Sequence, residues 1–324
     1  MRPDFKIIAN GTDITPLIAD RLLSLTVTDE RGEKSDTAVI EIDNRERRIA
    51  VPPTGATMEI WLGYRKTGQT RLGVFTCDEI ELSGPPDVLT IEGKAADMGK
   101  SLKAAKTRSW DAMTLGGIVS TIAGEHGLAP RTAEDLAATA YEHLDQTDES
   151  DLHFLTRLAR DLDAVAKPAQ RHLLFVPRGD TKAASGALLT PVTANPADLA
   201  GGWKARFADR GKYTAVKAYW HDVEGAARRE VMAGSGRPVF TLRNPFPNEA
   251  EAIAAARAKL RALGRGTATF EAEFIGRPDF AAEAPLNLQG FGAAVDGAWV
   301  LTQVTHSYRD GTGYRCSIEA EQKA

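Results

Sequence analysis

Cysteine is scarce in this sequence of 324 residues, which contains only Cys77 and Cys316. They lie far apart, and neither stands in a zinc-ligand pattern, so we expect two free thiols in a reducing compartment. Long hydrophobic runs are also missing, since no segment reaches the roughly 20 apolar residues of a membrane span. The opening stretch, MRPDFKIIANGTDITP, lacks the apolar run of a signal peptide. We therefore expect a soluble protein that is made in a cytoplasm and has no membrane anchor.

Motifs of catalysis and cofactor binding are missing as well. The six histidines are scattered without an HExxH motif, there is no GxSxG elbow, and no lysine follows a Walker-type glycine run. No metal or cofactor is therefore expected. His306 lies on the same face of a predicted strand as Val304 and Tyr308, which favours a hydrogen-bonded structural histidine over a catalytic base. The net charge of -4 argues against specific nucleic-acid binding.

One acidic cluster, formed by Asp148, Glu149 and Asp151, allows two interpretations. Paired carboxylates are the machinery of glycoside hydrolysis, but one of them then needs an apolar environment that raises its pKa. These acids instead lie together at a predicted helix start, where carboxylates complement the positive end of the helix dipole. We therefore interpret the cluster as helix capping, with Asp148 or Ser150 as the N-cap.

The composition, 43% hydrophobic and 26% charged, predicts a globular chain with two or three cores. Its first part has the pattern of an antiparallel barrel or sandwich, because short alternating apolar stretches are separated by turn residues. The predicted strands are Phe5–Ala9, Leu22–Thr28, Thr37–Asp43, Met58–Tyr64, Leu72–Leu82 and Val88–Glu92.

Helical periodicity dominates the middle of the chain. Apolar residues at helical spacing predict an amphipathic helix from about Asp151 to Val165, with Pro168 preventing its continuation into a strand at 173–176. A connector is expected from Asp180 to Ala200. The other predicted elements here are a strand at 102–110 and helices at 114–126 and 132–140.

Strand patterns return after residue 200, interrupted by one alanine-rich helix. Asn248 and Glu251 have capping-box spacing, and Gly264 is placed to end the helix 249–263. The predicted strands of this part are 203–207, 213–222, 267–275, 286–288, 298–308 and 314–321.

An internal repeat links the two β-rich parts. Aligning residues 73–80 with 297–304 without gaps matches Gly73 to Gly297 and Phe75 to Trp299, and each stretch precedes a turn and another strand. Unrelated β-hairpins also share glycines and aromatics, but the repeated order favours a duplicated barrel. The predicted fold is mainly β (α+β), with two related antiparallel β-barrels and a small α/β insertion between them. The predicted domains are 1–97, 98–199 and 200–324, with helix 249–263 inserted in the last.

The segment from Gln146 to Ala159 resembles the late control protein D family, the tail hubs of contractile-tailed phages. A related segment occurs in the hub part of type VI secretion spike proteins. The residues that carry the resemblance are Gln146, Ser150, Asp151, Phe154, Leu155, Arg157, Leu158 and Ala159. Further similar stretches include Gly297, Trp299 and His306 near the end of the chain, and Cys316 stands where the family more usually has threonine.

This resemblance implies two tail-tube-like barrels and a structural role without enzymatic activity. It further implies a homotrimer that forms a pseudo-sixfold ring, with the central spike protein, the tail tube protein and the tape-measure protein as partners. The protein would belong to a virion tail or baseplate and would be assembled in the bacterial host cytoplasm. Two alternatives remain: a tail-associated cell-wall hydrolase, and a carbohydrate-binding module for host recognition. The positions of Trp61, Trp220 and Trp299 within predicted strands disfavour the latter, because they indicate packing.

Overall fold

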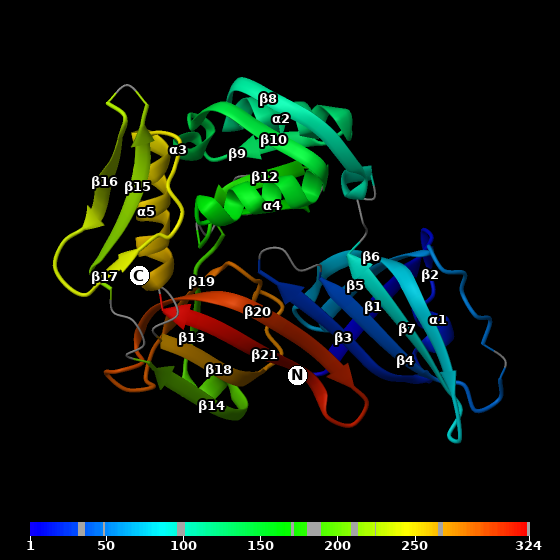
Figure 1. Ribbon diagram of the computed structural model, residues 1–324. Helices are drawn as coiled ribbons and strands as arrows, with labels where there is room; N and C mark the ends of the chain where they lie inside the picture. Colours follow the sequence, from blue (N-terminus) through cyan, green and yellow to red (C-terminus); the bar gives the residue numbers. More distant parts are fainter. Residues whose placement is uncertain are drawn as a thin grey trace. The chain divides into compact units, whose positions relative to one another are not determined.

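The computed structural model describes residues 1–31, 36–47, 49–95, 101–169, 172–179, 189–208, 213–223, 225–264 and 268–322. The chain is mainly β with a few helices, and most of its strand pairs are antiparallel (Figure 1), as the sequence predicted. It divides into two compact units. Unit 1 comprises Met1–Asp97, Leu189–Ala205 and Phe270–Ala320, and unit 2 comprises Met98–Leu188, Arg206–Thr269 and Glu321–Ala324.

Unit 1 is built on one large sheet, which has 13 strands among the described residues. The strand order is β14-β18-β21-β20-β3-β4-β7-β6-β5-β1-β2, with β19 joined to β20 and β13 to β19. All six strands predicted before residue 96 are present. The strands are β1 (Pro3–Ala9), β2 (Thr12–Asp13), β3 (Leu22–Glu30), β4 (Thr37–Asp43), β5 (Thr57–Tyr64), β6 (Gly68–Ser83), β7 (Val88–Ala95), β13 (Val192–Ala194), β14 (Leu199–Phe207), β18 (Ala268–Ile275), β19 (Pro285–Leu288), β20 (Gly297–Arg309) and β21 (Gly313–Gln322). A single helical turn, α1 (Thr15–Ile18), follows β2.

The same strand order occurs twice in this sheet. The first series is β3-β4-β7-β6-β5, and the second is β14-β18-β21-β20-β19. The internal repeat lies on the equivalent strands β6 and β20. Phe75 of β6 lies opposite Met58, and Trp299 of β20 lies opposite Leu286. The bulky aromatic residue of each repeat therefore faces an apolar residue of the preceding strand.

The equivalence extends to backbone hydrogen bonds just beyond these strand pairs. The Cys77 amide donates to the carbonyl of residue 56 and its carbonyl accepts from residue 55, both at 2.8 Å. The Leu301 amide donates to the carbonyl of residue 284 at 3.0 Å, and its carbonyl accepts from residue 283 at 2.8 Å. Cys77 and Leu301 correspond in the ungapped alignment, so the duplication is visible at the level of individual backbone atoms.

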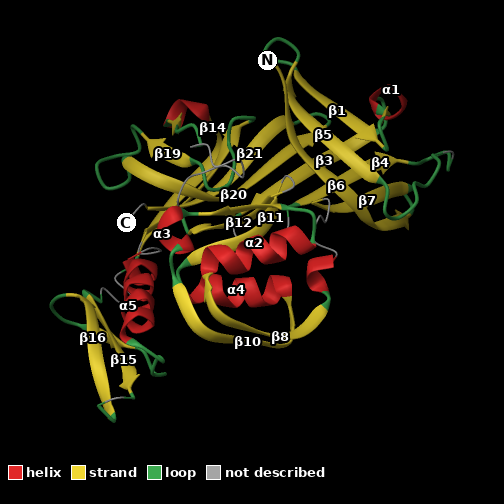
Figure 2. Cartoon of the chain, turned by 90° about the horizontal axis from the view of Figure 1, so that it is seen from above, coloured by secondary structure: helices red, strands yellow, loops and turns green. Residues whose placement is uncertain are grey.

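Unit 2 contains a two-stranded antiparallel sheet, two packed helices and a small three-stranded sheet. The two-stranded sheet pairs β8 (Ala105–Thr114) with β10 (Ala140–Ser150). Helices α2 (Leu115–Glu125) and α4 (Asp151–Asp161) lie side by side next to it, as Figure 2 shows. The sheet joins β11 (Ala164–Ala169), β12 (His172–Pro177) and β9 (Ala129–Thr132), and the short α3 (Glu134–Ala137) lies between β9 and β10. Apolar residues of all these layers, including Ile118, Leu155 and Phe175, form one buried core.

The rest of unit 2 is a hairpin against a helix. Strands β15 (Ala215–Asp222), β16 (Ala227–Gly234) and β17 (Val239–Thr241) form a small sheet, against which α5 (Glu249–Gly264) packs its alanines. The predicted capping box of this helix is confirmed. The Glu251 amide donates to Asn248 Oδ1 at 3.0 Å, and Asn248 Nδ2 donates to Glu251 Oε1 at 2.9 Å.

Several local expectations were wrong. Helix α4 ends at Asp161 and not at about Val165, because the chain turns at Asp163 (φ 55°) and enters β11, which contains Pro168. The expected helix 132–140 shrinks to one turn before β10, and β16 was missed because its exposed charged residues hide the alternation of a strand. The expected connector contains β13, whereas its residues 180–188 lie outside the described residues. Among the described helices, none is long and apolar enough to cross a bilayer.

Candidate functional site

The motif residues between 146 and 158 gather where four elements of unit 2 meet. Gln146 lies near the end of β10, Ser150 ends that strand, and Asp151 begins α4. Both Gln146 and Asp151 are completely buried. A buried carboxylate is costly unless cations and hydrogen-bond donors surround it, so the contacts of Asp151 determine what this site does.

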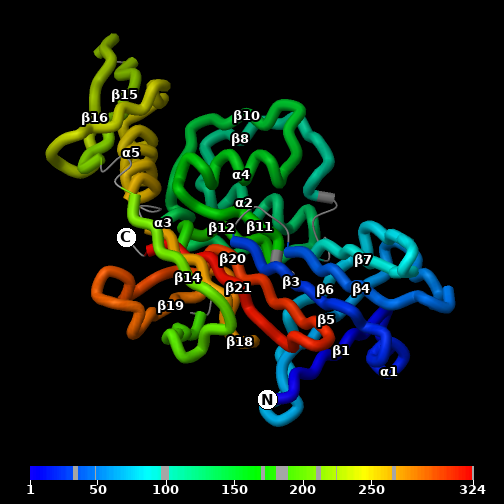
Figure 3. Tube along the Cα trace, turned by 90° about the horizontal axis from the view of Figure 1, so that it is seen from below, coloured from blue at the N-terminus to red at the C-terminus, as the bar shows by residue number. Residues whose placement is uncertain are grey.

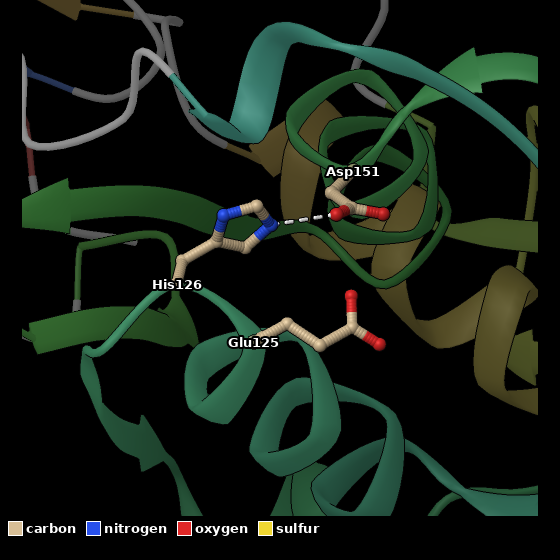
Figure 4. A group of neighbouring side chains, drawn as sticks. All are labelled: Glu125, His126 and Asp151. Carbon is tan, nitrogen blue, oxygen red and sulfur yellow. Dashed lines mark hydrogen bonds and ion pairs between the residues drawn. The ribbon is translucent and has the colours of Figure 1, made fainter.

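Asp151 receives hydrogen bonds from four side chains. Its Oδ2 accepts from Lys106 Nζ at 2.6 Å and contacts His126 Nε2 at 2.8 Å. Its Oδ1 accepts from Arg108 Nη2 at 2.5 Å and from Gln146 Nε2 at 2.8 Å. Figure 4 shows His126 reaching Asp151 from the end of α2, beside Glu125. The carboxylate therefore joins the β8–β10 strand pair, the C-terminus of α2 and the N-terminus of α4.

Glu125 completes the network from its more exposed side. Its carboxylate accepts from Lys106 Nζ at 2.7 Å and from Arg108 Nη1 at 2.7 Å. Arg108 also donates through Nε to Gln146 Oε1 at 2.9 Å and lies over the Trp110 ring at 4.3 Å. Two cations are thus shared by two carboxylates, and every polar group of Gln146 that faces inward is used.

The protonation of this network follows from its contacts. Burial alone would raise the pKa of Asp151, but hydrogen bonds from Lys106, Gln146 and His126, with the charge of Arg108, lower it to about 2. Burial likewise opposes the charged form of Lys106, yet Asp151 and Glu125 raise its pKa. We call Lys106, Arg108, Glu125, His126, Gln146 and Asp151 the Asp151 network. Since its contacts lower the pKa of Asp151 and Glu125 and raise that of Lys106, these three side chains are charged at neutral pH.

The same cluster contains the one potential metal-ligand group among the described residues. Ligand atoms of Glu125, His126 and Asp151 all lie within 4.8 Å of one another. However, Lys106 and Arg108 already bind both oxygens of Asp151 and both of Glu125. A divalent cation would have to displace two fixed positive charges, so these residues do not fit a metal site.

The neighbouring motif residues secure the start of α4. Ser150 is the N-cap, because its Oγ accepts from the His153 amide at 3.2 Å. Arg157 donates to Glu149 at 2.9 and 3.2 Å and to the Asp145 carbonyl at 3.0 Å, which ties the helix back to β10. Asp148 takes no part as a cap; it is exposed, with φ of 47° at a bulge of the strand.

The apolar motif residues form the inner face of the same helix. Phe154, Leu155 and Leu158 are buried in the core of unit 2. Phe154 stacks on Trp110 of β8, with ring centroids 5.9 Å apart and planes 10° from parallel. The motif thus specifies both a hydrophobic contact and an ion-pair network at one junction.

Gly297, Trp299 and His306 lie elsewhere, on β20 of unit 1. Trp299 is buried and donates through Nε1 to the Val295 carbonyl at 2.8 Å. His306 Nδ1 lies 2.8 Å from the Tyr314 hydroxyl and 3.2 Å from Cys316 Sγ. Burial lowers the pKa of His306 to about 4 and raises that of Cys316 to about 12, so this is a neutral, unreactive group.

Sequence reasoning missed Lys106, Arg108, Glu125 and His126. The signal that could have indicated them is that Lys106 and Arg108 lie two residues apart, on the same face of one strand, with Arg108 opposite Gln146. This signal can be recognised only when residues 140–150 are known to be the partner strand. Cys77 and Cys316 are both buried free thiols, as expected.

Solved structures show the same fold. A 43 kDa tail protein of prophage MuSo2 from Shewanella oneidensis aligns over 99% of this chain and 98% of its own, with a TM-score of 0.73 and 14% identity. A tail protein from Neisseria meningitidis aligns over 99% and 97%, with a TM-score of 0.71 and 10% identity. An E. coli component of the type VI secretion system, described as structurally similar to T4 tail proteins gp27 and gp5, gives a TM-score of 0.52 at 13% identity over 93% and 73%.

Sequence comparisons identify the family. The probable baseplate hub protein of Escherichia phage 186 is 33% identical over 100% of this chain and 94% of its own length. That of Escherichia phage P2 is 33% identical over 99% and 93%. The family model described as phage tail baseplate hub (GPD) matches residues 50–312. The chain therefore belongs to the phage tail baseplate hub (GPD) family.

Proposed function

We propose that this hub protein is non-enzymatic and forms a trimeric ring with pseudo-sixfold symmetry, which joins a central spike to the tail tube. The observation that carries the proposal is the repeated strand order, β3-β4-β7-β6-β5 and β14-β18-β21-β20-β19, within one chain. Three chains with two similar barrels each supply six similar positions around an axis. Such a ring matches a threefold spike on one side and a sixfold tube on the other.

The predicted domain division is part of the same proposal. Residues 1–97 and 200–324 are the two barrel repeats, residues 98–199 are an insertion between them, and the helix 249–263 is inserted in the second repeat. Spike, tube and tape-measure proteins are the proposed partners, because the relatives from phages 186 and P2 are named as probable baseplate hub proteins. Assembly in the host cytoplasm, before the tail is complete, belongs to the same proposal.

The geometry favours this role over a hydrolase or a sugar-binding module. Asp151 has a pKa of about 2 and is enclosed by donors, so it cannot serve as the protonated acid that glycoside hydrolysis needs. Its neighbour Glu149 is paired with Arg157. Trp299 is buried, and Trp220 packs against the core under α5. These tryptophans serve packing and do not form a platform for a sugar ring.

The test is the solution mass by light scattering across a range of protein concentrations, alone and with the spike protein from the same particle. We expect a mass about three times that of the 34.9 kDa chain, at the latest when the spike is present. A chain that remains monomeric at the highest concentration and also ignores the spike would overturn the ring. Cell-wall hydrolysis by the purified trimer would overturn the non-enzymatic role.

A further inference from the structure

The two repeats meet inside the chain along a single seam. Beyond Leu301, the edge of β20 pairs antiparallel with β3, from Gln303 opposite Glu30 to Arg309 opposite Ser24. Figure 3 shows β20 between β21 and β3. Side chains cross the seam as well, since Gln303 Nε2 donates to Glu30 Oε1 at 2.6 Å. The second repeat is thus joined to the first by strand pairing.

The equivalent edge of β6 has no such partner. Its first part, up to Thr76, pairs with β5, and Cys77 is bonded to residues 55–56. From residue 78 to Ser83, β6 pairs with β7 along its opposite edge. Along the edge that corresponds to the β3-paired edge of β20, no described strand pairs with this segment. This segment of β6 therefore presents an open strand edge.

The second open edge belongs to β14. In the repeated order β14 occupies the place of β3, which pairs with β4 on one side and β20 on the other. Among the described strands β14 pairs with β18 alone, so it ends the sheet. Among the described strands, each chain thus has two unpaired edges that correspond to the internal seam. One is the edge of β6 that corresponds to the β3-paired edge of β20, and the other is the edge of β14 that corresponds to the β20-paired edge of β3.

Side chains are buried at the internal β20–β3 seam and more exposed at the two open edges. At the internal seam Val27, Val304 and His306 are all at most 2% exposed. Leu82, which corresponds to His306 in the alignment, is 59% exposed on β6, and Trp203 on β14 is 44% exposed. Each open edge thus carries a large, partly exposed apolar side chain that pairing with another strand edge would cover.

The charges of the two edges are opposite. The end of β6 carries Glu79 and Glu81, whereas β14 carries Lys204 and Arg206. The side chains of Glu81, Lys204 and Arg206 form no hydrogen bond or ion pair with another residue in the part of the chain that the structure describes. An acidic edge and a basic edge attract each other and oppose pairing of like with like.

We propose that residues 78–83 of β6 in one copy pair antiparallel with β14 of a second copy, so that the internal β20–β3 seam is repeated between chains. The contact is heterologous, because each copy offers one edge of each kind, and repetition closes a ring if the rotation permits. This inference rests on the proposed ring function. It adds the identity of the two strands that form the ring contact and the direction in which they pair.

Charge reversal tests the seam in full-length protein. Glu81→Lys and Lys204→Glu each place like charges across it, and we expect each to raise the concentration at half-assembly about three- to tenfold at low salt. The double variant restores opposite charges and returns the value to within about twofold of the parent. The matched control is Lys66→Glu in the exposed β5–β6 turn, which leaves assembly unchanged.

Amide hydrogen exchange supplies a second measurement that does not depend on side-chain charge. Peptides covering residues 78–83 and 199–204 gain protection when the chain assembles, whereas Gly68–Val74, already paired with β5, does not change. A ring of the expected mass with no protection at either edge, and no rescue in the double variant, overturns the seam while the hub function stands. A chain that never assembles overturns both.

Discussion

The two units stabilise buried polar groups in opposite ways. In unit 2 Asp151 is fully buried and remains charged, because Lys106 and Arg108 bind it directly. In unit 1 His306 is equally buried and remains neutral, with Tyr314 and Cys316 as its partners. The buried carboxylate between β8, β10 and the helices of unit 2 thus depends on ion pairs, and the buried histidine on β20 of unit 1 depends on neutral hydrogen bonds. Removal of charge and change of pH therefore affect the two units differently.

The largest expected effect comes from removing the charge at the centre of the Asp151 network. Asp151→Asn keeps the size of the side chain but leaves Lys106 and Arg108 without their buried partner. We expect a loss of about 3–5 kcal/mol in the free energy of unfolding of unit 2, since breaking one side of a buried ion pair leaves an uncompensated charge. Urea unfolding followed by hydrogen exchange, peptide by peptide, measures it.

The matched control for this change is Asp148→Asn, an exposed aspartate three residues earlier. Asparagine tolerates its positive φ, so the control changes unfolding by less than about 0.5 kcal/mol. If Asp151→Asn were as mild as the control, the network would not be what joins the β8–β10 strand pair to α2 and α4. A loss confined to unit 1 would contradict the comparison of the two units.

Mild acid is expected to weaken unit 1 first. The folded pKa of His306 is about 4, below its ordinary value of 6.5, because burial disfavours the charged ring. The unfolded chain therefore binds a proton before the folded chain does, and stability falls as the pH falls from about 6.5 to 4. The full loss is about 3 kcal/mol. Hydrogen exchange of β20 and β21 between pH 7 and 4.5, corrected for intrinsic rates, measures it.

The variant His306→Gln removes this titration while keeping a hydrogen-bonding side chain at the position. Its unit 1 is expected to be less stable at pH 7 but to lose no further stability between pH 6.5 and 4.5. An unchanged pH dependence in that variant would assign the acid sensitivity of unit 1 to another group.

Stronger acid is expected to weaken unit 2. Asp151 has a folded pKa of about 2 against an ordinary 3.8, because its donors outweigh burial. Its stabilising contribution is complete above pH 4 and is lost as the pH falls toward 2, amounting to about 2 kcal/mol. Exchange of β8 and α4 peptides between pH 5 and 2.5 follows it. Asp151→Asn abolishes that part of the pH dependence, and an unaltered profile would show that other carboxylates cause it.

The sequence predicted unit 1 better than unit 2. All six strands before residue 96 and the Gly73–Gly297 equivalence could be read from alternation and turn residues, which are local signals. The Asp151 network could not, because Lys106 and Glu125 reach Asp151 only after β8 and β10 pair and α2 packs beside α4. Nor could the order of the large sheet be predicted, since β20 and β3 pair at Gln303 and Glu30, which are 273 residues apart in the sequence. Long-range pairing of this kind leaves no pattern in either strand alone.

The smallest expected effect separates the cap of α4 from the ion pairs around it. Ser150→Ala removes the acceptor for the His153 amide but leaves Asp151 and its donors unchanged. We expect a loss of about 1 kcal/mol in unit 2, the usual cost of an N-cap serine. Thr147→Ala, at an exposed position of β10, is the control and costs a few tenths of a kcal/mol at most. A Ser150→Ala effect as large as that of Asp151→Asn would mean that capping, and not the buried charge network, holds α4 against the β8–β10 strand pair, and the contrast between the two units would then lose its basis.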